Sequence, residues 1–162
     1  LGVVTPTTVL RTKVSCCAIN DFCSLANAKS MPVAAAIRRS CDDLDYLHDV
    51  GGLDVNISGC KNACGHEHTG HIGILGVDKQ GAEFYQISIG GAQGDDVAPG
   101  KALGPSVSRA EVADVIGRLI GFYLARRDSE EERFIDLVRR IGIEPFKEHV
   151  QDRLEKSGVS LS

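Results

Sequence analysis

Four cysteines form two closely spaced pairs in this chain, and they are the residues best suited to chemistry. Five residues separate Cys17 from Cys23 and three separate Cys60 from Cys64, with a stretch long enough for a helix between the pairs. Four thiolates can surround a 4Fe-4S cluster or a tetrahedral zinc ion. Common zinc ribbons and fingers use spacings of about two to four residues in both halves, and the first pair departs from that pattern. The spacing therefore favours an iron–sulfur cluster over zinc.

The second pair lies in residues 58–65, which read Ser-Gly-Cys-Lys-Asn-Ala-Cys-Gly. The glycines that flank the pair allow a tight turn and a close approach of the backbone to a bulky cofactor. If the chain turns helical there, Cys60 and Cys64 lie on one face of the helix, and backbone N–H groups at its start point toward the cluster. We expect Cys17 and Cys23 to approach from a loop on the opposite side.

The two remaining cysteines have simpler interpretations. Cys41 lies on an apolar stripe with a helical period and is interpreted as core packing. Cys16 directly precedes Cys17 and is an alternative to it as a ligand. In an extended segment the side chains of neighbouring residues face opposite ways, so only one of the two can serve.

The composition excludes several classes of function. The 162 residues are 43% hydrophobic, carry a net charge of −4 and include no Trp, so neither a nucleic-acid-binding surface nor a base-stacking platform is expected. No stretch approaches the roughly 18 apolar residues of a membrane span. A chain with this many core residues does not need a disulfide framework, so we expect reduced thiols and a cytoplasmic location. The start lacks Met and a signal-peptide pattern, and we interpret it as processed or truncated, with truncation favoured.

Strand patterns precede and follow the second cysteine pair. Residues 1–16, rich in Val and Thr, predict a strand that leads into the first pair, and the alternation over 53–57 predicts another directly before the second. The β-rich runs 71–77 and 84–89 are separated by Asp-Lys-Gln-Gly, which predicts a β-hairpin. A glycine-rich loop follows at 90–100.

Four helices are predicted from capping residues and apolar periodicity. The first is capped by Ser30, has Pro32 in its first turn and stops at Gly51-Gly52. The signals for the other three are a capping box at Ser108 and Glu111, a second box at Ser129 and Glu132 with an end at Gly142, and Pro145 with an end near Lys156. Strands and helices are mixed without a regular βαβ alternation. The pattern predicts an α+β fold, with a mixed sheet that contains a β-hairpin, flanking helices and a C-terminal helical segment.

The two cysteine motifs resemble those of the siroheme-containing nitrite and sulfite reductases. That family has Cys-x5-Cys followed by Thr/Ser-Gly-Cys-x-Asn-x-Cys-Gly, and this chain has the first motif at 17–23 and the second at 58–65. The similarity continues through the hydrophobic run 71–77 and Gly90-Gly91, and it covers roughly residues 10–140.

The resemblance implies two cofactors, a 4Fe-4S cluster and siroheme. The implied ligands of the cluster are the four paired cysteines, Cys17, Cys23, Cys60 and Cys64. In the family the last of these, here Cys64, also bridges to the siroheme iron. Ser58 and Asn62 match motif positions that lie against the siroheme and are candidate contacts to it.

The implied reaction is the six-electron reduction of nitrite to ammonia or of sulfite to sulfide, with electrons from a ferredoxin or a flavoprotein. Most of the Arg and Lys side chains that bind the anion and the siroheme carboxylates in this family come from the N-terminal half of a longer polypeptide, to which nothing here corresponds. We therefore expect the C-terminal portion of such an enzyme, inactive alone and without an assigned catalytic residue. Whether the portion alone retains either cofactor stays open.

The same resemblance implies a division of the chain. Residues 1–105 are expected to form the 4Fe-4S- and siroheme-binding α+β domain, and residues 106–162 a C-terminal helical segment that packs on it. The natural partner is the N-terminal half of the enzyme. We expect the chain alone to self-associate through apolar surface that this half would cover.

Three histidines, His66, His68 and His71, follow the second cysteine pair and suggest a zinc site. No helix-spaced histidine pair of the form His-x3-His occurs in this segment. We interpret the segment as a polar lining of the siroheme cavity, where a histidine can supply protons or positive charge to the anion. Two other classes of function stay open: a 4Fe-4S electron carrier without siroheme, and a zinc-stabilised interaction module.

Overall fold

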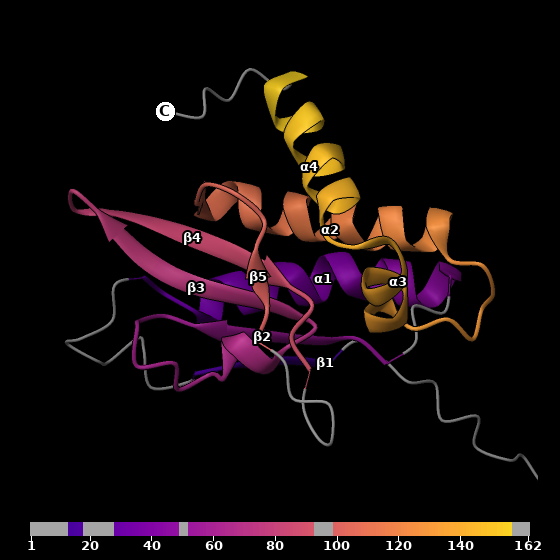
Figure 1. Cartoon of the computed structure of the whole chain (residues 1–162). Coiled ribbons are helices and arrows are strands. Elements are labelled where there is room, and N and C mark those ends of the chain that lie inside the picture. Colours follow the sequence, from indigo (N-terminus) through magenta and orange to yellow (C-terminus); the bar gives the residue numbers. More distant parts are fainter. Residues whose placement is uncertain (1–12, 18–27, 49–51, 93–98, 157–162) are drawn as a thin grey trace, which may run out of the picture.

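The computed structural model describes residues 13–17, 28–48, 52–92 and 99–156 (Figure 1). Six strands form one sheet in the order β1-β2-β3-β4-β5, and β6 pairs with β4 beside that path. The strands are β1 (Lys13–Cys16), β2 (Asp54–Ser58), β3 (Ile72–Lys79), β4 (Ala82–Ile89), β5 (Lys101–Ala102) and β6 (Val107–Ser108). The helices are α1 (Met31–His48), α2 (Arg109–Arg126), α3 (Phe134–Ile141) and α4 (Glu144–Lys156), with a short 3₁₀ turn η2 (Glu67–Thr69).

The sheet is mixed: the strand pairs on its β1 side are parallel, and those on its β4 side are antiparallel. β1 pairs parallel with β2 and β2 pairs parallel with β3, whereas β3 and β4 are antiparallel. The crossover from β1 to β2 contains α1, as a parallel connection requires. The predicted α+β fold, with a mixed sheet, flanking helices and a C-terminal helical segment, is confirmed.

The predicted hairpin is also confirmed. β3 and β4 are joined by the two residues Gln80 and Gly81, whose φ angles are 56° and 83°. Positive φ at both central positions is what a two-residue turn between right-twisted strands needs. Asp78 closes the turn, because its carboxylate accepts the Gly81 N–H at 2.9 Å.

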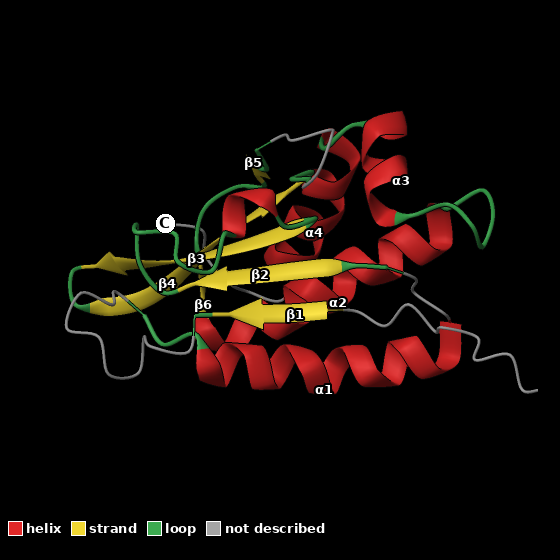
Figure 2. Ribbon diagram, turned by 90° about the horizontal axis from the view of Figure 1, so that it is seen from below, coloured by secondary structure: helices red, strands yellow, loops and turns green. Residues whose placement is uncertain are grey.

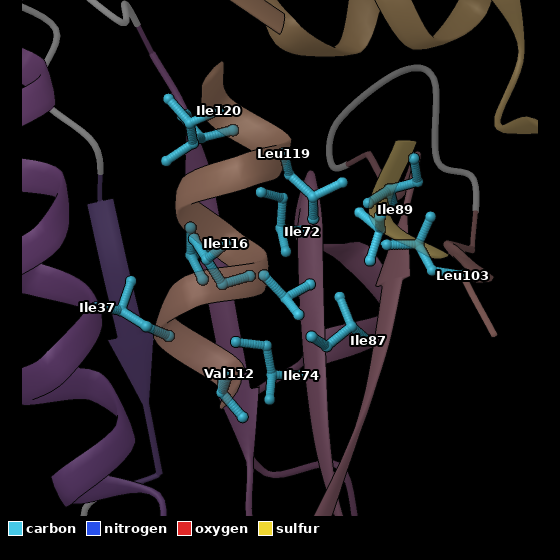
Figure 3. Packing of buried hydrophobic residues seen from close by; sticks show 14 of the residues in the cluster. Ile37, Ile72, Ile74, Ile87, Ile89, Leu103, Val112, Ile116, Leu119 and Ile120 are labelled. Carbon is cyan, nitrogen blue, oxygen red and sulfur yellow. The ribbon is translucent and has the colours of Figure 1, made fainter. Parts of the chain in front are cut away.

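The core lies between one face of the sheet and the helices. Side chains of α2 pack onto alternate residues of β3 and β4, and Ile37 of α1 joins them (Figure 3). Figure 2, seen from below, places α2 and α4 behind the sheet and the turn η2 in front of it. Cys41 is buried in the same hydrophobic cluster, which confirms its interpretation as core packing. No helix within the described ranges has both the length and the apolar character for a membrane span.

The predicted start of α2 is confirmed, whereas the predicted start of α3 is wrong. At α2 the capping box is present, and the Ser108 N–H donates to the Glu111 carboxylate at 2.8 Å. At α3 the predicted box of Ser129 and Glu132 is wrong, because the helix starts four residues later and Arg133 takes the N-cap position. The Glu132 carboxylate instead accepts from Asp128 N–H and from Arg140, so it is no longer available to a helix N-terminus.

The end of α3 and the start of α4 follow the prediction. Gly142 terminates α3 with a φ of 79°, the left-handed backbone that glycine adopts at low cost. Pro145 lies in the first turn of α4, where its missing N–H is not needed.

Candidate functional site

The two cysteine segments leave the sheet side by side. β1 and β2 run parallel with Cys16 opposite Ile57, so the next residues along the two strands are Cys17 and Ser58. The Cys17 N–H extends the ladder by donating to the Ile57 carbonyl at 3.2 Å. Because parallel strands end at the same edge, the backbone at Cys17 lies beside the segment that carries Cys60.

The described residues on either side of 18–27 are held at the end of β2. The buried Ser30 hydroxyl donates to the Cys17 carbonyl at 2.7 Å, and the Ala28 N–H donates to the Gly59 carbonyl at 3.1 Å. Cys17 and Ala28 are therefore both held against the end of β2. Cys23 itself falls at 18–27, outside the described residues.

The expected side-chain cap of α1 is not formed. Ser30 is at the N-cap position, since its carbonyl accepts the Ala34 N–H at 2.9 Å, but its hydroxyl is directed to Cys17. The predicted position is correct, and only the side-chain bond of a cap is missing, because the hydroxyl is turned toward the Cys17 carbonyl. Tyr85 adds a second tie here, since its hydroxyl donates to the Lys29 carbonyl at 2.7 Å.

The segment from Cys60 to Cys64 is not helical, which corrects the conditional expectation that the two side chains share a helix face. It consists of two successive turns, closed by Ala63 N–H to the Cys60 carbonyl at 3.2 Å and His66 N–H to the Ala63 carbonyl at 2.8 Å. Ala63 and His66 have φ angles of 55° and 51°, in the left-handed region. Residues 59–71 make the return connection between the parallel strands β2 and β3, and the left-handed backbone at Ala63, between the two cysteines, excludes a regular helix through the pair.

Ser58 and Asn62, the two predicted siroheme contacts, have different environments. Asn62 is exposed. Ser58 is only 1% exposed, and its hydroxyl accepts the Gly65 N–H at 3.0 Å while donating to the Glu67 carboxylate. Glu67 had no signal in the sequence, because its partner lies nine positions earlier on a strand.

Gly65 is required by its surroundings. A Cβ on Gly65 would lie 2.1 Å from the Ile57 carbonyl oxygen, a distance that no side chain tolerates. The residue that directly follows Cys64 therefore packs its backbone onto β2. This contact, together with the Ser58 hydrogen bond, brings the two ends of the cysteine segment together.

The histidines after the second pair do not follow an extended path. The turn η2 brings the exposed rings of His66 and His68 to a centroid separation of 6.2 Å. His71 has a structural contact, since its Nδ1 accepts the Asp54 N–H at 3.1 Å. Burial lowers the pKa of His71 below its ordinary value, although the Asp54 carboxylate opposes the shift.

The cysteines differ in exposure: Cys60 is 5% exposed, Cys17 is half-buried and Cys64 is exposed. None of the five described cysteines forms a disulfide. Within the described ranges, no three His, Cys, Asp or Glu side chains gather closely enough to hold a metal ion. The donor set fits a 4Fe-4S cluster in its chemistry, because thiols from two adjacent strand ends are present, while Cys23 lies outside the described part of the chain.

Comparison with known proteins agrees with these features. The family described as "Nitrite and sulphite reductase 4Fe-4S domain" matches residues 10–157. The assimilatory ferredoxin-dependent nitrite reductase of Haloferax mediterranei is 30% identical over 116 residues, which cover 68% of this chain and 20% of that protein. A ferredoxin sulfite reductase of Mycobacterium tuberculosis is 31% identical over 140 residues, which cover 80% of this chain and 25% of that protein.

The fold has a counterpart among solved structures. The NirA protein of Mycobacterium tuberculosis matches with a TM-score of 0.67 and 28% identity, over 83% of this chain and 26% of that chain. The chain thus spans about a quarter of the length of the proteins it resembles. By the extent of these matches, the chain belongs to the nitrite and sulphite reductase 4Fe-4S domain family.

Proposed function

We propose that this chain is the cluster-bearing portion of a siroheme-dependent nitrite or sulfite reductase. The observation that carries the proposal is the pairing of β1 with β2, which brings the backbone at Cys17 beside the segment that leads to Cys60. Two sequence-distant cysteine segments at one sheet edge are a suitable arrangement for a cofactor with four thiolate ligands.

In this proposal the cluster is held by Cys17, Cys23, Cys60 and Cys64. The burial of Cys60 keeps water away from one side of the site, and the two turns after it carry Cys64 to the surface. An exposed Cys64 suits the bridging role that the family resemblance implies, and the exposed Asn62 can reach the same group. When bound, the cluster and siroheme would pass electrons from a ferredoxin or a flavoprotein to nitrite or sulfite for its six-electron reduction.

The rest of the enzyme completes the proposal. Since the chain spans about a quarter of its relatives, the side chains that bind the anion and the siroheme carboxylates would come from the N-terminal half. Relatives named as ferredoxin-dependent reductases and as an NADPH sulfite reductase hemoprotein component support a ferredoxin or a flavoprotein as the electron donor.

Anaerobic reconstitution of the chain with iron and sulfide tests the proposal. We expect about four iron and four sulfide per chain, with broad visible absorbance that is lost in Cys60→Ser. Cys41→Ser is the matched control, because Cys41 is also buried but belongs to the core. About one tightly held zinc and no iron per chain would instead indicate a zinc-stabilised module.

A second measurement separates the reductase from a simple electron carrier. The complete enzyme, purified from cells that make siroheme, should show sharp porphyrin-type absorbance bands in addition to the cluster absorbance. Cluster absorbance alone would favour a 4Fe-4S electron carrier.

A further inference from the structure

The segment that carries Cys60 and Cys64 is closed by one buried hydroxyl. Ser58 lies before both cysteines, and its Oγ accepts the N–H of Gly65, the residue directly after Cys64, at 3.0 Å. The same hydroxyl donates its hydrogen to the Glu67 carboxylate. We call these three residues, Ser58, Gly65 and Glu67, the Ser58 clamp.

Hydrogen bonds join β2 to the chain after Cys64, and they end on different residues. The other bonds described within the segment are internal to each turn, such as Ala63 N–H to the Cys60 carbonyl at 3.2 Å. Asn56 of β2 donates to the His66 carbonyl at 3.0 Å. The clamp reaches Gly65, directly after Cys64, so it sets the span between the two ends of the segment, and the Asn56 bond adds a link one residue further on.

The burial of Ser58 determines what its hydroxyl can do. With 1% of the residue exposed and both hydroxyl bonds made inside the chain, the side chain has no free direction toward an external ligand. We infer that Ser58 is a positioning residue that acts through Gly65 to hold the Cys60–Cys64 segment in its turned conformation. Glu67 assists it as the acceptor of the Ser58 hydroxyl hydrogen.

Opening of the segment can be measured in the metal-free chain, because Cys60 is 5% exposed and must open to react. Its alkylation by iodoacetamide follows the population of the opened state when reclosing is faster than the reaction. Cys41 serves as a reference in the same molecule, since it is 2% exposed in the core and reports the opening of the core. The ratio of the Cys60 alkylation rate to the Cys41 alkylation rate therefore measures local opening of the segment. Peptide mass spectrometry measures both rates.

In Ser58→Ala we expect this ratio to rise about tenfold, because the Gly65 N–H and the Glu67 carboxylate both lose their partner. Ser58→Thr keeps a hydroxyl and should return the ratio to within about threefold of the original chain. Glu67→Ala, a second variant in case Ser58→Ala does not fold, should raise the ratio by about threefold, because it leaves the Gly65 bond in place.

Ser108→Ala is the matched control. It removes a serine hydroxyl that donates to the Glu111 carboxylate at 2.7 Å, a bond of the same kind in the cap of α2, and should leave the ratio unchanged. An unchanged ratio in Ser58→Ala, or an equal rise in Ser58→Thr, would overturn the inference.

A second arm measures the reconstituted cluster and rests on the proposed function. Iron loss to a chelator should be faster in Ser58→Ala than in the original chain and slow again in Ser58→Thr, with Ser108→Ala unchanged. A complete enzyme that assembles no cluster would contradict the proposed function, while the alkylation arm would still decide whether the Ser58 clamp holds the segment.

Discussion

Gly65→Ala is the change that most directly tests how the second cysteine segment packs on β2. The new Cβ would lie 2.1 Å from the Ile57 carbonyl oxygen and 2.9 Å from the Ser58 Oγ. Because normal contact needs a longer separation, the backbone at position 65 must move by about 1 Å or more. That movement breaks the 3.0 Å bond from the Gly65 N–H to Ser58.

We expect Gly65→Ala to lower the free energy of unfolding by about 2–4 kcal/mol, from overpacking together with the lost buried hydrogen bond. The φ of Gly65 is not among the positive values, so backbone strain adds nothing to this figure. Urea denaturation of the metal-free chain, followed by circular dichroism, measures the change.

Gly121→Ala is the matched control, since a Cβ on Gly121 of α2 meets nothing within 4 Å. Alanine is the better helix former, so this variant should be more stable by roughly 0.5–1 kcal/mol. If Gly65→Ala were as stable as the original chain, the close packing of the Cys64–Gly65 backbone on β2 would be wrong.

Three further predictions concern other parts of the chain. Tyr85→Phe removes the 2.7 Å bond to the Lys29 carbonyl and should lower the free energy of unfolding by about 1 kcal/mol in urea denaturation, whereas no change would mean that water replaces the bond. Burial lowers the pKa of His71 in the folded state, so below the ordinary histidine pKa of about 6.5 the unfolded chain binds more protons and stability falls with decreasing pH. Denaturation at several pH values should show this loss in the original chain and a smaller loss in His71→Gln, and equal losses would refute it. Sedimentation of the chain alone should show self-association, and a monomer at high concentration would contradict the predicted apolar surface.

That last prediction receives little support from the described residues. Met31, at 39% exposed, is the one large hydrophobic side chain classed as exposed among them. Several side chains on the sheet face opposite the helices, including Leu75, Val77 and Phe84, are half-buried rather than exposed. Self-association therefore remains a prediction from the family resemblance and not from the surface seen in the fold.

Local signals predicted the elements whose determinants lie within a few residues. The β3–β4 hairpin follows from a turn sequence that ends in Gly81, and the start of α2 follows from Ser108 and Glu111, three positions apart. The end of α3 at Gly142 follows from the conformational freedom of glycine. In each case the residues that determine the turn or the helix terminus lie within a few positions of it, so a sequence pattern can identify them.

The predictions that failed have partners far away in sequence. Ser30 was expected to cap α1, but its hydroxyl bonds to a carbonyl 13 positions earlier. Glu132 was expected to cap α3, but Arg140, eight positions later, binds its carboxylate. No local pattern distinguishes a serine that caps a helix from one that bonds to a distant carbonyl. The difference depends on which strand lies beside the serine.

The same reasoning explains why the cysteine motifs indicated the family but not the conformation of the second segment. The spacing of Cys60 and Cys64 suits a helix face, and nothing within the motif excludes that. The exclusion is seen only in the fold, where Ala63, between the two cysteines, has a φ of 55° and two successive turns replace the helix. Hydrogen bonds within the chain hold the connection from β2 to β3, through the Ser58 clamp and the bond from Asn56 to His66. The backbone next to Cys60 and Cys64 is thus held against β2 by partners seven and ten positions apart in sequence, contacts that the spacing of the cysteines alone does not predict.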